Sequence, residues 1–147
     1  MVSELIFSEI DVEKITRLLL ALALGAVIGF ERQLKKRPAG MRTHMLVSLG
    51  SAIFTVVGLS LEPNTSRIAE AIATGIGFLG AGAIIAQGGR VRGITSAATL
   101  WAVAALGVLV GTGDYWLGII VTALIFGTLE IDRIKRFSES GTYSEEG

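Results

Sequence analysis

Five long segments of the chain are almost free of charged residues, and this pattern restricts the fold more than any other feature. A helix of 17 to 19 such residues spans about 25 to 29 Å, close to the hydrocarbon thickness of a bilayer. Only 18% of all residues are charged, which leaves little sequence for a water-exposed exterior. Lipid offers no partners to backbone N–H and C=O groups, so the segments should be helices. They are Ile15–Phe30, His44–Leu61, Ile68–Ala86, Thr95–Val110 and Tyr115–Ile131.

The connections between these segments indicate how the chain crosses the membrane. Cytoplasmic loops of membrane proteins carry an excess of Lys and Arg. Here ten of the 13 basic residues lie in the first loop, the third loop and the C-terminal stretch, which share one side. We therefore predict an all-α polytopic membrane protein, a bundle of about five transmembrane helices with the N-terminus outside and the C-terminus cytoplasmic. Residues 1–137 form one domain in this prediction, and residues 138–147 form a disordered tail.

The composition excludes several classes of function. Without cysteine the chain has no disulfide framework, no thiolate metal site and no cysteine nucleophile. His44 is the only histidine and the formal net charge is zero, so we expect neither a His-rich zinc site nor a nucleic-acid partner. No residues form the pattern of a hydrolase triad, a catalytic carboxylate pair or a nucleotide-binding loop. We expect a protein of the lipid bilayer that is not an enzyme and has no cofactor.

The stretch GIGFLGAGAII, residues 75–85, matches the GxGxxG pattern of dinucleotide-binding turns. That pattern works only between a strand and a helix N-terminus, and the chain shows no βαβ alternation. Membrane helices use small residues for close backbone approach, so we interpret these glycines as helix-packing positions. An alternative stays open, in which the helix bends at its glycines and exposes carbonyls to a cation or a pore. The predicted packing glycines are Gly25, Gly29, Gly75, Gly77, Gly80 and Gly82, with Gly107 and Gly111 repeating the spacing in the fourth segment.

Polar residues at the ends of the apolar segments are the candidate functional positions, because charge is costly at membrane depth. A tight turn at residues 37–40 would let Glu31 pair with Arg42 across two helix ends. Two interpretations stay open for the set as a whole. Its members either line an ion path or form interfacial ion pairs and topology determinants, with Glu70 stabilising a helix N-terminus. The set is Glu31, Arg32, Arg42, Thr43, Glu70, Arg92, Thr95 and Thr99.

Four motifs in order make the chain resemble a known family. They are GAVIGFERQ at residues 25–33, AGMRTH at 39–44, GIGFLGAGAII at 75–85 and VRGITSAATLWA at 91–102. Their order and spacing, over about residues 18–113, resemble those of the MgtC/SapB family of bacterial inner-membrane proteins. The polar positions that match the family pattern are Glu31, Arg32, Arg42, Thr43, Arg92 and Thr99.

The resemblance implies a multi-pass protein of the bacterial inner (cytoplasmic) membrane with about five helices. Members of the MgtC/SapB family are linked to adaptation to low magnesium and to survival inside host phagocytes. At least one is thought to restrain the F-type ATP synthase through a contact within the membrane. Longer members carry a soluble C-terminal domain, and they have Asn and Cys where this chain has Thr95 and Ala102. The chain is therefore expected to be a short, SapB-like relative.

Two functions follow from the residues and the resemblance. The first is a non-enzymatic role in magnesium or ion homeostasis and stress adaptation, through helix contacts with a second copy or another membrane protein. The F-type ATP synthase is a partner implied by the resemblance alone. The second is a small oligomeric channel or transporter for Mg²⁺ or another cation. The residues along its path would be Glu31, Arg42, Thr43, Glu70 and Thr99. Mg²⁺ would be a ligand or regulator in either case, and no residues are assigned to a metal site.

Overall fold

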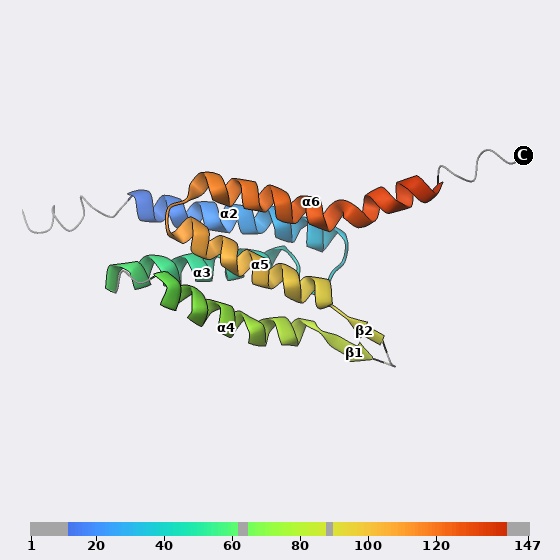
Figure 1. Ribbon diagram of the computed structural model, residues 1–147, viewed down its shortest axis with the longest axis horizontal. Helices are drawn as coiled ribbons and strands as arrows, with labels where there is room; N and C mark the ends of the chain where they lie inside the picture. The colour runs from blue at the N-terminus through green and yellow to red at the C-terminus, as the bar shows by residue number, and fades with distance from the viewer. Residues whose placement is uncertain (1–11, 62–64, 88–89, 141–147) are drawn as a thin grey trace, which may run out of the picture.

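The computed structural model describes residues 12–61, 65–87 and 90–140, which form a helical bundle with a short β-hairpin (Figure 1). Strands β1 (Ile85–Gln87) and β2 (Arg90–Arg92) pair antiparallel between the fourth and fifth helices. The predicted all-α class is confirmed, and successive helices run in opposite directions (Figure 1). The helices are α2 (Val12–Leu34), α3 (Met41–Leu61), α4 (Thr65–Ala83), α5 (Ile94–Gly111) and α6 (Tyr115–Ser140).

Helices α3 and α5 form the centre of the bundle. Helices α2 and α6 pack on one side of this pair, and α4 lies on the other (Figure 1). Both central helices are apolar around most of their circumference, as expected for helices that are covered by other helices or by lipid. Fully buried apolar side chains join α2, α3 and α5 into one core, and they are Ala21, Ile28, Ala52, Val103, Leu106 and Val110.

Glycines on two sides of α3 allow its neighbours to touch its backbone. A Cβ atom on Gly25 of α2 would lie 2.8 Å from the carbonyl oxygen of His44, and one on Gly29 would lie 2.9 Å from the Cβ of His44. From the other side, a Cβ atom on Gly107 of α5 would lie 2.2 Å from the carbonyl oxygen of Ser48. Any larger residue at these positions would push the helices apart. Close backbone contact through small residues is the packing mode of membrane helices.

The glycines of α4 are arranged differently. A Cβ atom on Gly80 would make an ordinary contact with the Cβ of Ala97 on α5, at 3.6 Å. A Cβ atom on Gly75, Gly77 or Gly82 would meet nothing within 4 Å. These three glycines therefore touch no other described helix, although Gly75 lines an apolar groove between α4 and α3. Their role as a packing face stays a prediction about contacts with another molecule.

The end of the third apolar segment differs from the prediction. We expected a helix through Ala86, whereas α4 ends at Ala83 and the chain continues as the hairpin, with Ile85 opposite Arg92. The hairpin returns the chain to the end of α4 at Gly93, whose φ is 92°. A Cβ atom on Gly93 would lie 2.0 Å from the carbonyl oxygen of Ala83, so the turn into α5 requires glycine. Apolar content alone could not separate the last helical turn from a β-strand.

The last helix is longer than predicted. Helix α6 continues to Ser140, beyond the expected end at Ile131. The first three residues of the predicted disordered tail, 138–140, are therefore helical. The prediction for residues 141–147 lies outside the described residues.

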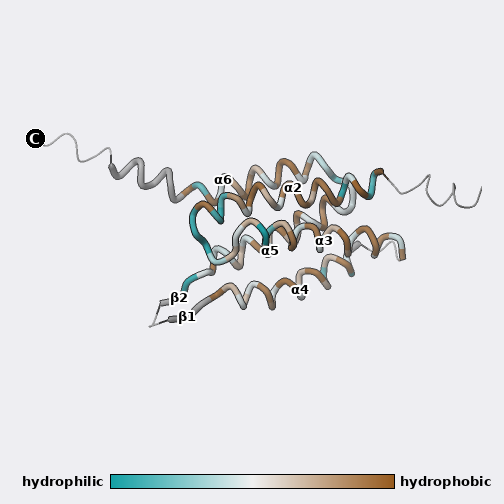
Figure 2. Tube along the Cα trace, turned by 180° about the vertical axis from the view of Figure 1, so that it is seen from behind, coloured by the Kyte–Doolittle hydropathy of each residue, from teal (hydrophilic) through white to brown (hydrophobic). Residues whose placement is uncertain are grey.

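Two of the described helices, α3 and α5, are long and apolar enough to cross a bilayer, and the apolar part of α6, Tyr115–Ile131, is shorter. Figure 2 shows hydrophobic residues along the middle of the bundle, and hydrophilic ones gathered where the α2–α3 turn and β2 lie. The separation matches what a bilayer requires of a protein that crosses it. Five crossings and an N-terminus on the outside stay predictions.

We expect Gly107→Ala to lower the stability of the bundle, because the added methyl group would meet the carbonyl oxygen of Ser48. Overpacking of this kind costs about 1–3 kcal/mol. The matched control is Gly127→Ala on α6, where an added Cβ meets no atom within 4 Å. The control should melt at the wild-type temperature or above it, since alanine favours a helix over glycine. Thermal unfolding in detergent micelles, followed by tryptophan fluorescence, measures both, and equal melting temperatures for the two variants would contradict the close approach of α5 to α3.

Candidate functional site

A buried ion pair lies near the end of α2. Only 4% of the surface of Glu31 and 2% of that of Arg32 are exposed. Arg32 donates from Nε to Oε2 of Glu31 at 2.5 Å and from Nη2 to Oε1 at 2.9 Å. Two parallel bonds between a guanidinium and a carboxylate form a strong, geometrically specific contact. The pairing is what allows both charges to be buried.

Lys35 connects this pair to α6. Its Nζ lies 2.6 Å from Oε1 of Glu31 and 2.8 Å from Oε1 of Glu130, and it donates to the carbonyl oxygen of Leu129 at 3.2 Å. The carboxylates of Glu130 and Glu31 raise the pKa of Lys35 above its ordinary value. Its contribution to stability is therefore complete at neutral pH, and it is lost only as the pH rises through this raised pKa in the alkaline range. From the sequence Lys35 counted only as a basic loop residue, because no local spacing relates it to Glu130.

The predicted pairing of Glu31 with Arg42 is wrong. The carboxylate of Glu31 forms ion pairs with Arg32 and Lys35, whereas Arg42 is exposed. Arg42 and the equally exposed Thr43 line an apolar groove of about 930 Å³ between α3 and α4. The cause is helix geometry, since His44 faces α2 and a residue two positions earlier lies roughly 200° around the helix.

Helix α3 presents a polar stripe to α2 and α5 that was not among the predicted positions. Its members follow the i, i+4, i+7, i+11 spacing of one helix face, and each is at most 5% exposed. Nδ1 of His44 donates to the carbonyl oxygen of Gly40 at 2.8 Å. Nε2 of His44 and Oγ of Ser48 have no hydrogen-bond partner among the described residues. The spacing of the stripe, His44, Ser48, Ser51 and Thr55, was a signal available in the sequence.

The polar residues at the start of α5 lie in two different environments, one buried and one exposed. Thr99 is 4% exposed and donates from Oγ1 to the carbonyl oxygen of Thr95 at 2.6 Å, a bond within its own helix. Thr95 and Arg92 are exposed, and they line a cavity of about 690 Å³ beside the α2–α3 turn. Ser96 lines the same cavity and is 2% exposed.

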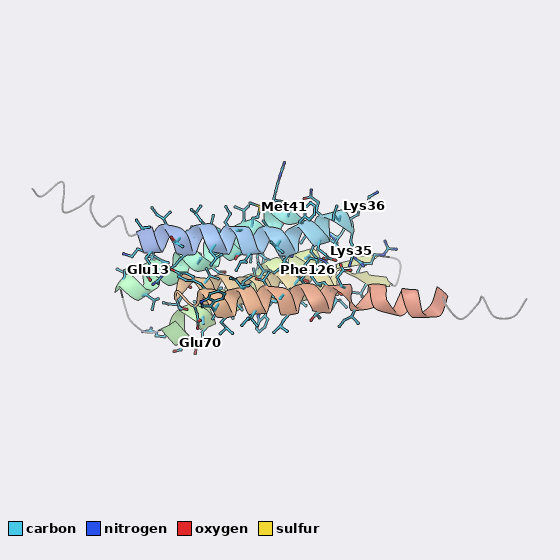
Figure 3. The ribbon with its side chains drawn as sticks, turned by 90° about the horizontal axis from the view of Figure 1, so that it is seen from above. Glu13, Lys35, Lys36, Met41, Glu70 and Phe126 are labelled. Carbon is cyan, nitrogen blue, oxygen red and sulfur yellow. The ribbon has the colours of Figure 1, made fainter. Side chains whose placement is uncertain are left out.

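Glu70 lies at the opposite end of the bundle from the buried pair. Figure 3 shows Glu70 on the first turns of α4, far from Lys35 at the end of α2. It is exposed, but α4 begins at Thr65, so Glu70 lies beyond the first turn and the predicted stabilisation of the helix N-terminus by Glu70 is wrong. The predicted ion-path residues are therefore divided between the two ends, and Glu31 lines neither of the two larger cavities. In the part of the chain that the structure describes, no three His, Asp or Glu side chains gather to hold a metal ion.

Glu31→Gln should destabilise the protein far more than Glu130→Gln. It leaves the buried guanidinium of Arg32 without a counter-charge, which costs about 3–5 kcal/mol. The side chain of Glu130 is 22% exposed and pairs with a partly exposed lysine, so its loss should cost less than about 1 kcal/mol. Unfolding in micelles at neutral pH measures both. A loss of equal size in the two variants would show that the Glu31 carboxylate is not the anchor of this cluster.

The chain matches the family model described as the MgtC family over residues 18–137. Protein MgtC of Salmonella typhimurium is 47% identical over 112 residues, covering 76% of this chain and 48% of that protein. Protein SrpB of Synechococcus elongatus is 44% identical over 136 residues, covering 82% of this chain and 74% of that protein. The "Putative magnesium transporter YhiD" of Escherichia coli is 41% identical over 129 residues, covering 81% of this chain and 60% of that protein.

No solved structure matches the chain. The chain spans about half the length of the Salmonella relatives that it matches, at 48%. The family model nevertheless covers most of the chain, and the SrpB match extends over more than two thirds of both proteins. The chain belongs to the MgtC family.

Proposed function

We propose that this chain is a multi-pass inner-membrane protein that acts in magnesium homeostasis through contacts with other membrane helices, and that it is not an enzyme. Family membership and the two bilayer-length apolar helices indicate a membrane protein. The words "magnesium transporter" in the name of the Escherichia coli relative support magnesium as the ion concerned. The chain covers only 48% of MgtC from Salmonella typhimurium. A role of that whole protein is therefore proposed for this chain and is not a finding about it.

Exposed apolar side chains support a lipid environment for helices beyond the two longest. Phe78 of α4 is 84% exposed, and Trp116 and Leu124 of α6 are 80% and 64% exposed. In water such a surface would promote aggregation, whereas in a bilayer it faces hydrocarbon. We place all five helices across the membrane, with the N-terminus outside and the C-terminus in the cytoplasm. This arrangement puts the basic α2–α3 turn on the cytoplasmic side, in agreement with the positive-inside rule.

The open glycine face of α4 is the observation that carries the proposal. Gly75 and Gly82 lie on one side of α4 together with Phe78, which is exposed. Both glycines are exposed, and a Cβ atom on either would meet no atom within 4 Å. Gly77 is equally open but lies on the opposite side of the helix. Each glycine weakens a helix by roughly 0.5–1 kcal/mol relative to alanine, so the face brings the isolated chain no benefit. It does let a second helix approach the backbone closely. The occupant is a helix of a second copy or of another membrane protein, and the F-type ATP synthase is a candidate by family resemblance.

A cysteine on this face should crosslink to the partner in native membranes. The chain has no cysteine of its own, so Gly82→Cys creates a single reactive thiol. The matched control is Gly127→Cys, at an equally open glycine of α6. We expect oxidative crosslinks at position 82, as a dimer of this chain or an adduct with another protein, and none at position 127. Crosslinks at neither position, or equally at both, would count against the α4 face.

Growth in magnesium-depleted medium tests whether the helix contact at α4 is needed for the role in magnesium homeostasis. The wild-type chain should restore growth to a bacterium that lacks its own family member. Gly82→Leu should fail, because its side chain fills the face, whereas Gly127→Leu should succeed at equal membrane abundance. If the wild-type chain did not restore growth, the magnesium role would be rejected even where the crosslink forms.

One observation favours a second function, the conduction of Mg²⁺ or another cation by an oligomer. Nε2 of His44 and Oγ of Ser48 lie without partners on the buried stripe of α3, among the described residues. Unsatisfied polar atoms inside an apolar bundle are costly, and in membrane proteins they mark water or ion pathways. Mg²⁺ would then be a transported ligand or a regulator.

Flux of Mg²⁺ into proteoliposomes tests this second function. If a path runs the length of the bundle along this stripe, Ser48→Ala and Glu70→Gln should each lower the flux severalfold. Thr128→Ala, on the exposed side of α6, should not change it. Absence of flux, or flux that neither Ser48→Ala nor Glu70→Gln affects, would leave helix contact as the function.

A further inference from the structure

A basic cavity of about 690 Å³ lies at the end of the bundle where the α2–α3 turn meets the start of α5. Figures 1 and 3 show Lys35 and Lys36 at the end of α2, on the same end of the molecule as the hairpin that leads into α5. Four of the residues that line the cavity are basic and none is acidic. The lining residues used below are Lys35, Lys36, Arg37, Arg92, Thr95 and Ser96.

Three of the four positive charges have no counter-charge in the described part of the chain. Lys35 is held by two carboxylates. Lys36, Arg37 and Arg92 are exposed, and their side chains form no hydrogen bond or ion pair with other described residues. Like charges around one cavity repel each other and create a positive potential inside it. The cavity is therefore suited to an anion of more than one charge.

A buried serine whose hydroxyl has no hydrogen-bond partner in the described part of the chain lies at the same wall and points to a ligand independently of the charges. Ser96 is 2% exposed and lines the cavity, and its hydroxyl has no hydrogen-bond partner among the described residues. It lies in the first turn of α5, where backbone N–H groups have no partner within the helix. Gly93, which precedes α5, has no side chain to cap them. The hydroxyl of Ser96 and these N–H groups are therefore hydrogen-bond donors without acceptors among the described residues. They lie beside the cavity that the side chains of Lys36, Arg37 and Arg92 line.

We propose that this cavity binds a phosphate group. Lys36, Arg37 and Arg92 neutralise its charge, while the hydroxyl of Ser96 and the N–H groups at the start of α5 donate to its oxygens. Two sources supply this chemistry, the headgroup of an anionic phospholipid at the membrane surface and free phosphate in solution. The site is separate from the α4 face, so its existence does not depend on the magnesium role.

The turn holds Lys36 in a conformation that lysine rarely adopts, with a φ of 51°. The N–H of Lys36 donates to the carbonyl oxygen of Gln33 and the N–H of Arg37 to that of Arg32, both at 3.0 Å. Helix ends of this form usually have glycine at the position of Lys36. A lysine there is less favourable for the turn, and it adds a charge to the cavity. The backbone bond to Arg32 fastens this wall of the cavity to the buried ion pair.

Thermal unfolding of the full chain in phosphatidylcholine nanodiscs tests the proposal, with inorganic phosphate as the probe against chloride at equal ionic strength. We expect phosphate to raise the melting temperature in a saturable manner. Arg92→Gln should weaken the apparent Kd for phosphate roughly tenfold, because a charge-assisted hydrogen bond is lost. The matched control is Arg42→Gln, which removes an exposed arginine near the same end of the bundle but from the separate α3–α4 groove. Its Kd should equal that of the wild type.

Lys36→Gly provides a second variant if Arg92→Gln does not fold. Glycine suits the φ of this position, so the variant should melt at or above the wild-type temperature while its affinity for phosphate falls. Unchanged affinity in both variants overturns the proposal. An equal loss of affinity in Arg42→Gln also overturns it, because phosphate would then respond to the overall charge of this end.

Native mass spectrometry separates the two sources. The chain is released from nanodiscs that contain phosphatidylcholine and phosphatidylglycerol. Retention of phosphatidylglycerol that disappears in Arg92→Gln, and that inorganic phosphate does not displace, identifies the lipid headgroup. Saturable stabilisation by inorganic phosphate without retained phosphatidylglycerol identifies free phosphate. If neither effect is seen, the cavity is not a phosphate site.

Discussion

The contact of α2 and α5 with the backbone of α3 is the interaction on which the rest of the structure depends. Gly25, Gly29 and Gly107 permit it, because a methyl group at any of them would lie within 3 Å of an atom of α3. The approach buries the polar stripe of α3 and the core around Leu106. It also holds the end of α2, where the buried charges and the basic turn lie, against the start of α3. In a bilayer, where apolar burial does not drive helix association, such packing supplies much of the cohesion.

Charged contacts fasten both ends of this tightly packed centre. At one end Arg17 of α2 donates from Nη1 to the carbonyl oxygen of Gly111 at 2.9 Å, which links α2 to the last turn of α5. At the other, Lys35 joins the buried Glu31 to Glu130 of α6. Helix α4 lies outside this framework, against α5 and beside the apolar groove. Its open glycines leave it the helix best placed to meet another molecule.

The sequence predicts the helices well because apolar segments of this length leave few alternatives, and the small-residue spacing points to the faces of α2 and α5 that meet α3. It does not predict the hairpin, since Ile85 continues an apolar run and only Gly93 marks the return. The Glu31–Lys35–Glu130 link joins helices that are distant in sequence, so no local pattern could reveal it. The stripe from His44 to Thr55 was visible at helical spacing, but its burial depends on which neighbours cover α3.

The arrangement of five crossing helices is tested most directly by labelling single cysteines in intact cells. The chain has no cysteine, so Lys36→Cys in the α2–α3 turn and Asp114→Cys between α5 and α6 each give one exposed thiol. With the N-terminus outside, a membrane-impermeant maleimide applied to spheroplasts should label position 114 at once. It should label position 36 only after the membrane is broken. Labelling of both positions from the same side would contradict the proposed topology.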